Sequence, residues 1–135
     1  MLKNLSHIGI AVQSIANATK FFGEILKLGE PKIIDVPDQQ VKVAIFPFAG
    51  FQIELLEPLG PDSTIAKFLE KRGEGIHHLC FNVEDIETAL TELKKAGITL
   101  IDEKPRIGAT GNKIAFVSPK STYGVLIELR EPKIK

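Results

Sequence analysis

The sequence carries one pattern twice, and this duplication constrains the fold more than any other feature. The first copy begins at His7 and reads His-Ile-x-Ile-x-Val-x-Ser-Ile-x-x-Ala, and the second begins at His78 and reads His-Leu-x-Phe-x-Val-x-Asp-Ile-x-x-Ala. Later in each half the segment Ile-Glu-Leu-x-Glu-Pro appears, at residues 53–58 and 127–132. Two blocks that recur in the same order indicate an internal duplication of one structural unit.

Each copy predicts a β-α-β-β-β unit. From Ser6 to Val12 apolar and small or polar residues alternate, which is typical of a half-buried strand. A helix follows, with Ser14 as its N-cap and Gly29 beyond its end. Ala49-Gly50 is expected to form a hairpin turn between the last two strands. The strand-like runs after the helix are Lys32–Val36, Val41–Phe48 and Phe51–Glu57.

The second half repeats this order after a connector. The connector, about residues 59–75, contains a short helix that Asp62 or Ser63 can cap. Asp85 is placed to cap the helix of the second unit. The strand-like runs of that unit are Ile76–Val83, Ile98–Ile101, Lys113–Val117 and Gly124–Arg130. We therefore expect a single α+β domain over residues 1–135, with one module at about 5–58 and the other at about 76–132.

Length and composition agree with one globular domain. The chain has 135 residues, of which 44% are hydrophobic and 25% charged, which is ordinary for a soluble protein with a real core. Its 17 basic and 17 acidic residues balance, so neither nucleic acid nor an anionic membrane is expected as a partner. No stretch is apolar enough for a signal peptide or a membrane span. The single cysteine, Cys80, cannot form an internal disulfide, and we expect a cytoplasmic protein.

The repeat predicts a metal site built from four side chains. In each first strand the apolar residues face the helix, so the histidine points to the other face, and the glutamate of each last strand shares that face. A buried carboxylate is costly unless it is paired, and two imidazoles with two carboxylates suit a divalent metal. If the modules pair into one curved mixed sheet, they form a cup with the helices outside. Its ligands would be His7, Glu54, His78 and Glu128, and its ion Co²⁺, Mn²⁺, Zn²⁺, Ni²⁺ or Fe²⁺.

The same residue types are usually structural when they occur singly. A lone strand histidine normally belongs to the core or the surface, and a lone strand glutamate normally faces water. Their coincidence in both modules favours the metal site. His77 lies on the face opposite to His78 and has no counterpart in the first module, so we expect it to be structural. Cys80 shares the inner face and is expected to be a small buried residue and not a nucleophile.

The chain resembles the vicinal-oxygen-chelate superfamily, and within it the methylmalonyl-CoA epimerase family. The resemblance covers essentially all 135 residues, and the final approach to Glu128 is its most specific part. The matching stretches are His7–Val12, Ile53–Pro58, Gly75–Leu79, Gly111–Phe116 and Pro119–Leu129. In that family paired βαβββ modules hold a metal, and the ligand set implied by position is the one derived above. Some relatives have Gln where this chain has Glu54.

The resemblance implies metal-dependent interconversion of the R and S forms of methylmalonyl-CoA, with an acyl-CoA as the small-molecule substrate. Chelation of the thioester and carboxylate oxygens stabilises the enolate that forms when the α-proton leaves. Glu128 is the family-type candidate for one proton-transfer role. The resemblance also implies a homodimer. Many bacterial relatives carry a second acid at the position of Val43, so another group, such as Glu54 or metal-bound water, must serve as the second base here, or the reaction differs.

The remaining substrate contacts are expected in the glycine-rich loop 108–112 and on two lysines. Backbone N–H groups around Gly111 and Asn112 are placed to hold the substrate carboxylate, and Lys120 and Lys113 are placed to meet CoA phosphates. Two other functions share the fold. One is a glyoxalase I-like lactoylglutathione lyase that uses the same ligands, and the other is a non-catalytic small-molecule binder. The intact ligand set and the scarcity of aromatic residues disfavour the binder.

Overall fold

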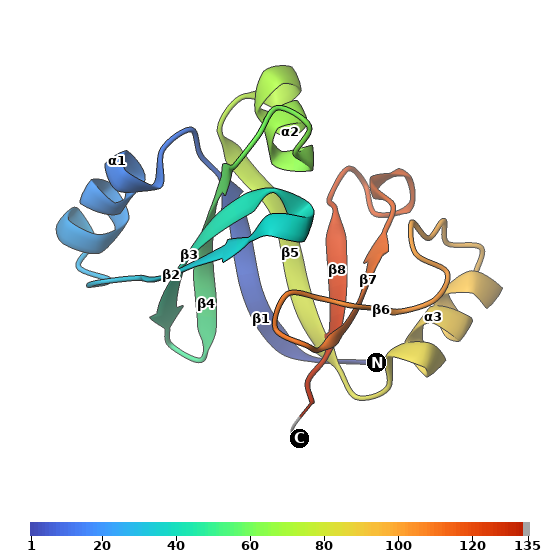
Figure 1. Cartoon of the computed structure of the whole chain (residues 1–135). Coiled ribbons are helices and arrows are strands. Elements are labelled where there is room, and N and C mark those ends of the chain that lie inside the picture. Colours follow the sequence, from blue (N-terminus) through green and yellow to red (C-terminus); the bar gives the residue numbers. More distant parts are fainter. Residues whose placement is uncertain (134–135) are drawn as a thin grey trace. The chain divides into compact units, whose positions relative to one another are not determined.

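A computed structural model of the chain describes residues 1–133, which divide into two compact units. One unit is formed by His7–His77, and the other by Met1–Ser6 together with the chain from His78 onward. Each unit carries one copy of the repeat (Figure 1). The elements in chain order are β1 (Leu2–Ala11), α1 (Ile15–Thr19), the π-helical turn η1 (Lys20–Ile25), β2 (Lys32–Val36), the 3₁₀ turn η2 (Pro37–Gln39), β3 (Val41–Phe48), β4 (Phe51–Pro58), α2 (Thr64–Arg72), β5 (Gly75–Val83), α3 (Ile86–Lys95), β6 (Arg106–Ile107), β7 (Lys113–Val117), the 3₁₀ turn η3 (Pro119–Ser121) and β8 (Ile127–Glu131).

The unit of residues 7–77 contains strands in the order β2-β3-β4-β1. β1 runs parallel to β4, whereas β2-β3 and β3-β4 are antiparallel pairs. The hairpin between β3 and β4 turns at Ala49 and Gly50, whose φ angles of 46° and 91° are both positive, as a two-residue type I′ turn requires. The hairpin and the bounds of β2 and β3 confirm the sequence-based expectation.

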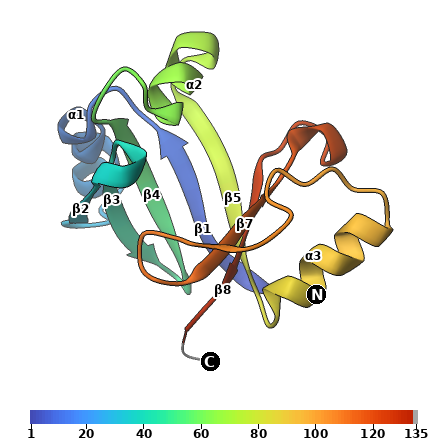
Figure 2. The same ribbon diagram turned by 45° about the vertical axis from the view of Figure 1, so that its right-hand side comes forward.

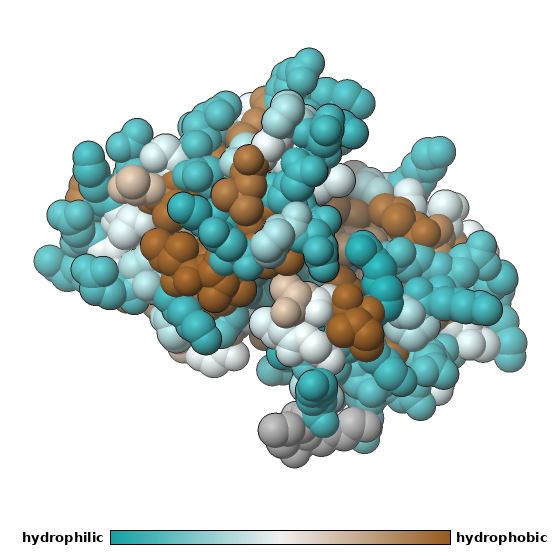
Figure 3. Space-filling view, in the orientation of Figure 1, coloured by the Kyte–Doolittle hydropathy of each residue, from teal (hydrophilic) through white to brown (hydrophobic). Residues whose placement is uncertain are grey.

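The two faces of these strands carry different cores. On one face Val12, Phe46 and Leu55 pack with Ile15 of α1. On the other face Ala11, Val43 and Leu56 pack with residues of α2. The apolar residues of β1 therefore face α1, as the alternation predicted, and His7 is left on the face that α2 shares. Hydrophobic side chains also reach the surface over β2 and β3 (Figure 3), and Ile33 and Phe48 are among the exposed ones.

The first helix is shorter and less regular than expected. Ser14 caps α1, since its hydroxyl accepts from the Asn17 backbone N–H at 3.1 Å. After Thr19 the chain widens into η1, in which Leu26 N–H donates to Phe21 O at 2.8 Å, five residues back. A Cβ at Gly23 would lie 2.7 Å from Gly29 O. The glycine thus lets η1 pack against the chain that leaves it, a contact that helical periodicity does not reveal.

The second unit places the start of β1 beside β5, followed by β8, β7 and β6. β5 and β8 are parallel, and the other two pairs, β7-β8 and β6-β7, are antiparallel. α3 covers one face, where Val83, Leu129 and Ile86 are buried together, and it lies beside β7 and β8 in both views (Figure 1, Figure 2). Asp85 caps α3 as predicted, because its Oδ1 accepts from the backbone N–H groups of Glu87 and Thr88.

Two predicted strand bounds are wrong in this unit. Residues Ile98–Ile101 form no strand beyond an isolated bridge from Leu100 to Val117, and the short edge strand is Arg106–Ile107 instead. β8 begins at Ile127 and not at Gly124. Gly124 is not part of an extended strand, because Tyr123 and Gly124 both have positive φ, 61° and 91°. The fold class is nevertheless the predicted one, α+β with two βαβββ modules.

The repeated Ile-Glu-Leu-x-Glu-Pro segment ties each last strand to the helix of its own module. Glu57 Oε1 accepts from the Ile15 backbone N–H at 2.7 Å, and Glu131 Oε1 accepts from the Ile86 backbone N–H at 3.0 Å. These donors belong to the first residues of α1 and α3, whose N–H groups have no partner within the helix. A carboxylate there also interacts favourably with the helix dipole. The second glutamate of the segment is therefore structural, a role that the sequence alone does not assign.

No helix within residues 1–133 combines the length and the apolar character that crossing a membrane requires. That the two units behave as one domain in solution stays a prediction.

Replacing either strand glutamate that caps a helix should destabilise the fold. We expect Glu57→Ala and Glu131→Ala each to lower the free energy of unfolding by about 1–2 kcal/mol, because a helix N-terminus loses a charged acceptor. Urea unfolding followed by circular dichroism measures the change. Glu70→Ala, on the exposed side of α2, is the control and should stay within about 0.5 kcal/mol. Equal stability of all three variants would contradict the capping role.

Candidate functional site

Each unit brings one predicted histidine next to one predicted glutamate. In the unit of residues 7–77, His7 Nδ1 lies 3.4 Å from Glu54 Oε2. In the other unit, His78 Nε2 lies 3.1 Å from Glu128 Oε1. The side chains are 11% and 14% exposed in the first pair and 8% and 10% in the second. The structure thus forms two buried imidazole–carboxylate pairs of the same composition.

Strand register explains why the two pairs are alike. Glu54 is the β1 register partner of Gly9, and Glu128 is the β5 register partner of Cys80. In both modules the partner lies two residues after the histidine, so the histidine and the glutamate project from the same face. The register partner of the glutamate is a small residue in each module, Gly9 or Cys80. In each module the first and last strands pair in parallel, and the register partner of the glutamate lies two residues after the histidine. This shared register makes the two pairs equivalent.

The chemistry of these pairs suits a divalent cation. Buried carboxylates are stable only when paired, and an imidazole supplies one partner in each unit. The same nitrogen and oxygen atoms are the ligand types that transition-metal ions prefer. The donor set of two imidazoles and two carboxylates therefore fits the expected metal. Cys80, fully buried beside Glu128 in register, is the small inner residue that was predicted.

Aromatic and cationic groups surround the second pair. The Phe116 ring lies edge-on to the His78 ring, with 6.0 Å between their centroids, and Phe116 is the β7 register partner of Glu128. The Arg106 guanidinium carbon lies 5.5 Å from the centroid of the same ring. Neither Phe116 nor Arg106 is predicted as a site residue from the sequence, because nothing in the local pattern distinguishes them from other residues of strands and loops.

The β3 side of the first pair is aliphatic. Val43 is buried, pairs in register with Leu56 and Ile34, and packs against Ile65 of α2. Ile45 is the β3 register partner of Glu54. The position at which many bacterial relatives carry an acid is therefore part of an apolar core in this chain. An acid there would need to displace that packing.

The predicted substrate loop is held by its own side chains. Asn112 is buried, its Nδ2 donates to Thr110 Oγ1 at 2.6 Å, and its Oδ1 accepts from the Lys133 backbone N–H at 2.9 Å. Gly111 has φ of 82° and donates to Gly108 O at 3.0 Å. The Asn112 amide therefore shapes the loop. Substrate contacts from Gly111 and Asn112 stay predictions.

The two predicted lysines and His77 lie in different settings. The hydrogen bond from Lys113 Nζ to Glu87 Oε1, 3.0 Å long, raises the pKa of Lys113 and engages its ammonium group. Lys120 is exposed in η3, so its role toward phosphates stays a prediction. The His77 ring lies 5.0 Å from the Phe68 ring of α2. This contact supports the structural role expected of His77.

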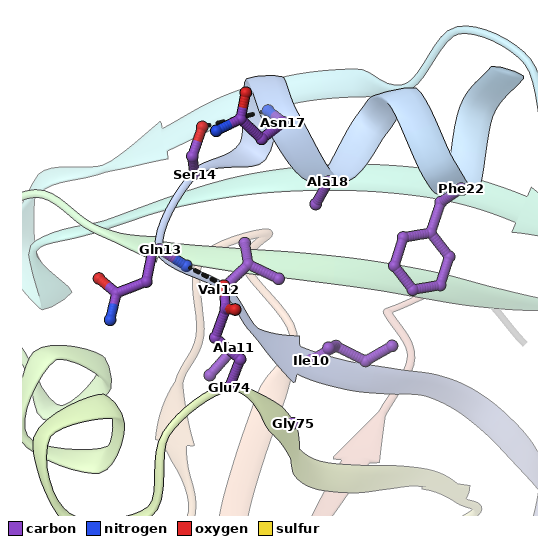
Figure 4. A pocket seen from close by; sticks show the side chains of 10 residues that line it. All are labelled: Ile10, Ala11, Val12, Gln13, Ser14, Asn17, Ala18, Phe22, Glu74 and Gly75. Atoms are coloured by element: carbon purple, nitrogen blue, oxygen red, sulfur yellow. Dashed lines mark hydrogen bonds between the residues drawn. The ribbon is translucent and has the colours of Figure 1, made fainter.

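A pocket of about 560 Å³ lies on the α1 side of β1. Ile10, Ala18 and Phe22 line it on its apolar side (Figure 4). Gln13 and Glu74 lie at its polar side, where the Gln13 backbone N–H donates to Glu74 Oε2 at 2.8 Å. This is the face of β1 opposite to His7, and no predicted site residue lines it. The pocket is thus separate from the histidine–glutamate pair of this unit.

The stability of an Asn112 variant tests whether the side-chain amide of this residue has a structural role in the loop. We expect Asn112→Ala to lower the free energy of unfolding by about 1–2 kcal/mol, because the Lys133 N–H and the Thr110 hydroxyl lose a buried partner. Thermal or urea unfolding measures this change. Lys120→Ala is the control and should leave stability within about 0.5 kcal/mol of the starting protein. Unchanged stability of Asn112→Ala would show that the loop does not depend on this amide.

Comparison with known proteins gives matches over nearly the whole chain. The sequence model of the Glyoxalase/Bleomycin resistance protein/Dioxygenase superfamily matches residues 6–116. An uncharacterized protein of Bacillus subtilis, YqjC, is 46% identical over 132 residues, which are 98% of this chain and 94% of that protein. The ethylmalonyl-CoA/methylmalonyl-CoA epimerase of Cereibacter sphaeroides is 41% identical over 135 residues, covering 97% of this chain and 99% of the relative.

Solved structures agree with the sequence comparison. Methylmalonyl-CoA epimerase from Mycobacterium tuberculosis superposes with a TM-score of 0.88 at 37% identity, covering 97% of this chain and 89% of that one. A methylmalonyl-CoA epimerase solved in complex with methylmalonyl-CoA and NH4+ superposes with a TM-score of 0.91 at 28% identity, covering 99% and 97%. The fold of this chain is therefore that of these enzymes.

Proposed function

Because this chain belongs to the Glyoxalase/Bleomycin resistance protein/Dioxygenase superfamily, we propose that it is an isomerase that interconverts the R and S forms of methylmalonyl-CoA. The observation that carries the proposal is the full-length similarity to epimerases of this substrate, one of them solved with methylmalonyl-CoA bound. The two buried histidine–glutamate pairs supply the side chains that this chemistry needs. The named enzymes compared above are epimerases, and this favours epimerisation over the lyase and the small-molecule binder.

The proposed metal ligands are His7, Glu54, His78 and Glu128. Their support is the identical register offset in the two modules, the low exposure of the four side chains, between 8% and 14%, and the nitrogen and oxygen donor types. A divalent cation held there supplies Lewis acidity, which draws electron density from carbonyl oxygens and makes the α-hydrogen easier to remove. The donor set accepts Co²⁺, Mn²⁺, Zn²⁺, Ni²⁺ or Fe²⁺, and availability selects among them.

Glu128 is the proposed general base on one face of the substrate. Its carboxylate is buried, and His78 Nε2 at 3.1 Å fixes the position of Oε1. Removal of the proton that lies between the thioester and carboxylate groups requires a base within hydrogen-bond reach of the α-carbon. The Phe116 ring is an apolar neighbour on one side of this pair. An apolar neighbour lowers the local polarity and strengthens the electrostatic interactions of the carboxylate.

Inversion needs a second proton-transfer group on the opposite face of the α-carbon. Val43 cannot serve, since it has no ionisable group and is buried in the core under α2. Glu54 is the carboxylate that matches Glu128 by register, and His7 holds it at 3.4 Å. We assign the second role to Glu54, so that the duplicated module supplies both the removing and the returning group.

The finer features of the proposal rest on family resemblance and composition. An acyl-CoA is the expected small-molecule partner. Assembly as a homodimer and a cytoplasmic location stay predictions.

Exchange of the substrate α-hydrogen in D₂O tests the separate proton-transfer roles of Glu128 and Glu54. The unchanged protein should both exchange the α-hydrogen of methylmalonyl-CoA and invert its configuration, followed by mass spectrometry and chiral analysis. Glu128→Gln should lower both rates by about 10²–10⁴-fold, because a positioned base is lost. Glu54→Gln should retain exchange on one epimer and lose inversion.

The matched control is Glu57→Gln, which removes a carboxylate from the same strand but outside the pair. It should retain inversion. Inversion at the original rate in Glu54→Gln would assign the second role to another group, and full activity of Glu128→Gln would overturn the proposed mechanism.

Metal content tests the ligand set independently of activity. Protein dialysed against Mn²⁺ or Co²⁺ and then desalted should retain a stoichiometric ion by elemental analysis, and EDTA should remove both the ion and the exchange activity. His78→Ala should weaken metal affinity by more than about tenfold, since loss of even an indirect partner costs 10–100-fold. His77→Ala, which removes the neighbouring histidine that contacts Phe68, should retain the ion. Equal affinity in His78→Ala and His77→Ala would refute the ligand assignment.

A further inference from the structure

An arginine stacks on the aromatic side chain next to the second histidine–glutamate pair. The Arg106 guanidinium carbon lies 5.5 Å from the Phe116 ring centroid, and that ring contacts His78 edge-on at 6.0 Å. Phe116 is the register partner of Glu128 and alternates with Ala115 and Val117, which belong to the core under α3. Phe116 therefore projects to the same face as Glu128. Arg106, lying over its ring, is on that face too.

Asp102 fixes the arginine and the aromatic residue together. Its Oδ1 lies 3.4 Å from Arg106 Nε, and its Oδ2 accepts from the Phe116 backbone N–H at 2.9 Å. The side chain of Asp102 is only 18% exposed, whereas that of Arg106 is 50% exposed. One carboxylate thus holds the guanidinium through Nε, while half of the arginine side chain stays exposed to solvent.

The terminal nitrogens of Arg106 have no hydrogen-bond or ion-pair partner among the described residues. Within residues 1–133 its contacts are the Asp102 carboxylate, through Nε, and the face of Phe116. A guanidinium is planar and presents pairs of N–H donors that match the two oxygens of a carboxylate or phosphate. Stacking on an aromatic ring orients that plane and stabilises the cation. The result is a preorganised cationic fork one aromatic ring away from His78.

We propose that Arg106 determines specificity by binding an anionic oxygen pair of the acyl-CoA substrate. The proposal rests on the proposed function, because that function supplies a substrate with two such groups. One is the carboxylate of the acyl group, and the other is a phosphate of CoA. Arg106 is not a proton-transfer group, since its guanidinium stays protonated. Its contribution is affinity and selection of acyl groups or carriers that bear negative charge.

The chain contains a matched arrangement that serves as the control. Arg72, at the end of α2, places its guanidinium carbon 5.9 Å from the Phe68 ring, and Phe68 contacts the His77 ring at 5.0 Å. This is the same order of arginine, phenylalanine and histidine, built on the histidine that is not a proposed ligand. Removing Arg72 removes a comparable cation–aromatic contact without touching the Arg106 fork.

Calorimetric titration of three thioesters tests the proposal without requiring turnover. The probes are malonyl-CoA, propionyl-CoA, which lacks the acyl carboxylate, and the malonyl thioester of pantetheine, which lacks the phosphates. The proteins are the unchanged chain, Arg106→Met, Arg106→Lys and Arg72→Met. Methionine keeps apolar contact with Phe116 but has no charge. Lysine keeps the charge but has no planar fork, so an intermediate affinity is expected. Thermal unfolding establishes that each variant is folded.

We expect Arg106→Met to weaken malonyl-CoA binding roughly 10- to 100-fold, the value of a charge-assisted hydrogen bond. If the carboxylate is the partner, the loss extends to malonyl-pantetheine and not to propionyl-CoA. If a phosphate is the partner, the loss extends to propionyl-CoA and not to malonyl-pantetheine. Either result supports the assignment and names the group. Arg72→Met should bind all three probes like the unchanged chain.

Three results would overturn the assignment. The first is undiminished affinity of Arg106→Met for every probe. The second is an equal loss of affinity for all three probes, which would indicate that Phe116 and its neighbours have changed position. The third is an equal loss of affinity in Arg72→Met. Failure of the proposed function has a different signature. In that case the unchanged chain itself binds none of the three thioesters, and the assignment to an acyl-CoA falls with it.

Discussion

The parallel pairing of the first and last strands within each module is the constraint on which the rest depends. It sets Gly9 opposite Glu54 and Cys80 opposite Glu128, and so brings a histidine and a glutamate together twice. A shift of one residue in either pairing would turn the glutamate to the opposite face of the strands, away from its histidine. The pairing also ends each last strand beside the helix of its own module. The same strand register therefore positions both the histidine–glutamate pair and the helix of each module.

The two glutamates of the repeated segment divide these tasks between them. Glu54 and Glu128 face the histidines, whereas Glu57 and Glu131 accept from the first N–H groups of α1 and α3. The three-residue spacing matters because side chains alternate along a strand. One carboxylate of each segment thus points to the site face, and the other reaches the helix terminus. Both modules therefore contain the hydrogen bond from the last strand to the helix as well as the proposed ligands.

The two copies have diverged around their carboxylates. Glu54 has Ile45 as its register neighbour, and Glu128 has Phe116. Only the second neighbour offers a ring face on which a cation can stack, and Arg106 occupies it. The two proposed carboxylate ligands therefore have different register neighbours, one aliphatic and the other aromatic with an arginine stacked on it. That inequality suits a reaction in which the two faces of one carbon are treated differently.

The sequence by itself determined the strands Lys32–Val36, Val41–Phe48 and Lys113–Val117 and the caps Ser14 and Asp85, because alternation and capping are local signals. The duplication also predicts the four proposed ligands, because a repeated pattern indicates a repeated geometry. The partners of Glu57 and Glu131, which lie 42 and 45 residues away, became evident from the tertiary structure. The tertiary structure also revealed the Arg106–Phe116 stack and showed that Ile98–Ile101 does not form the predicted strand. Each of these depends on which segments meet in space, and residue spacing along the chain does not encode that.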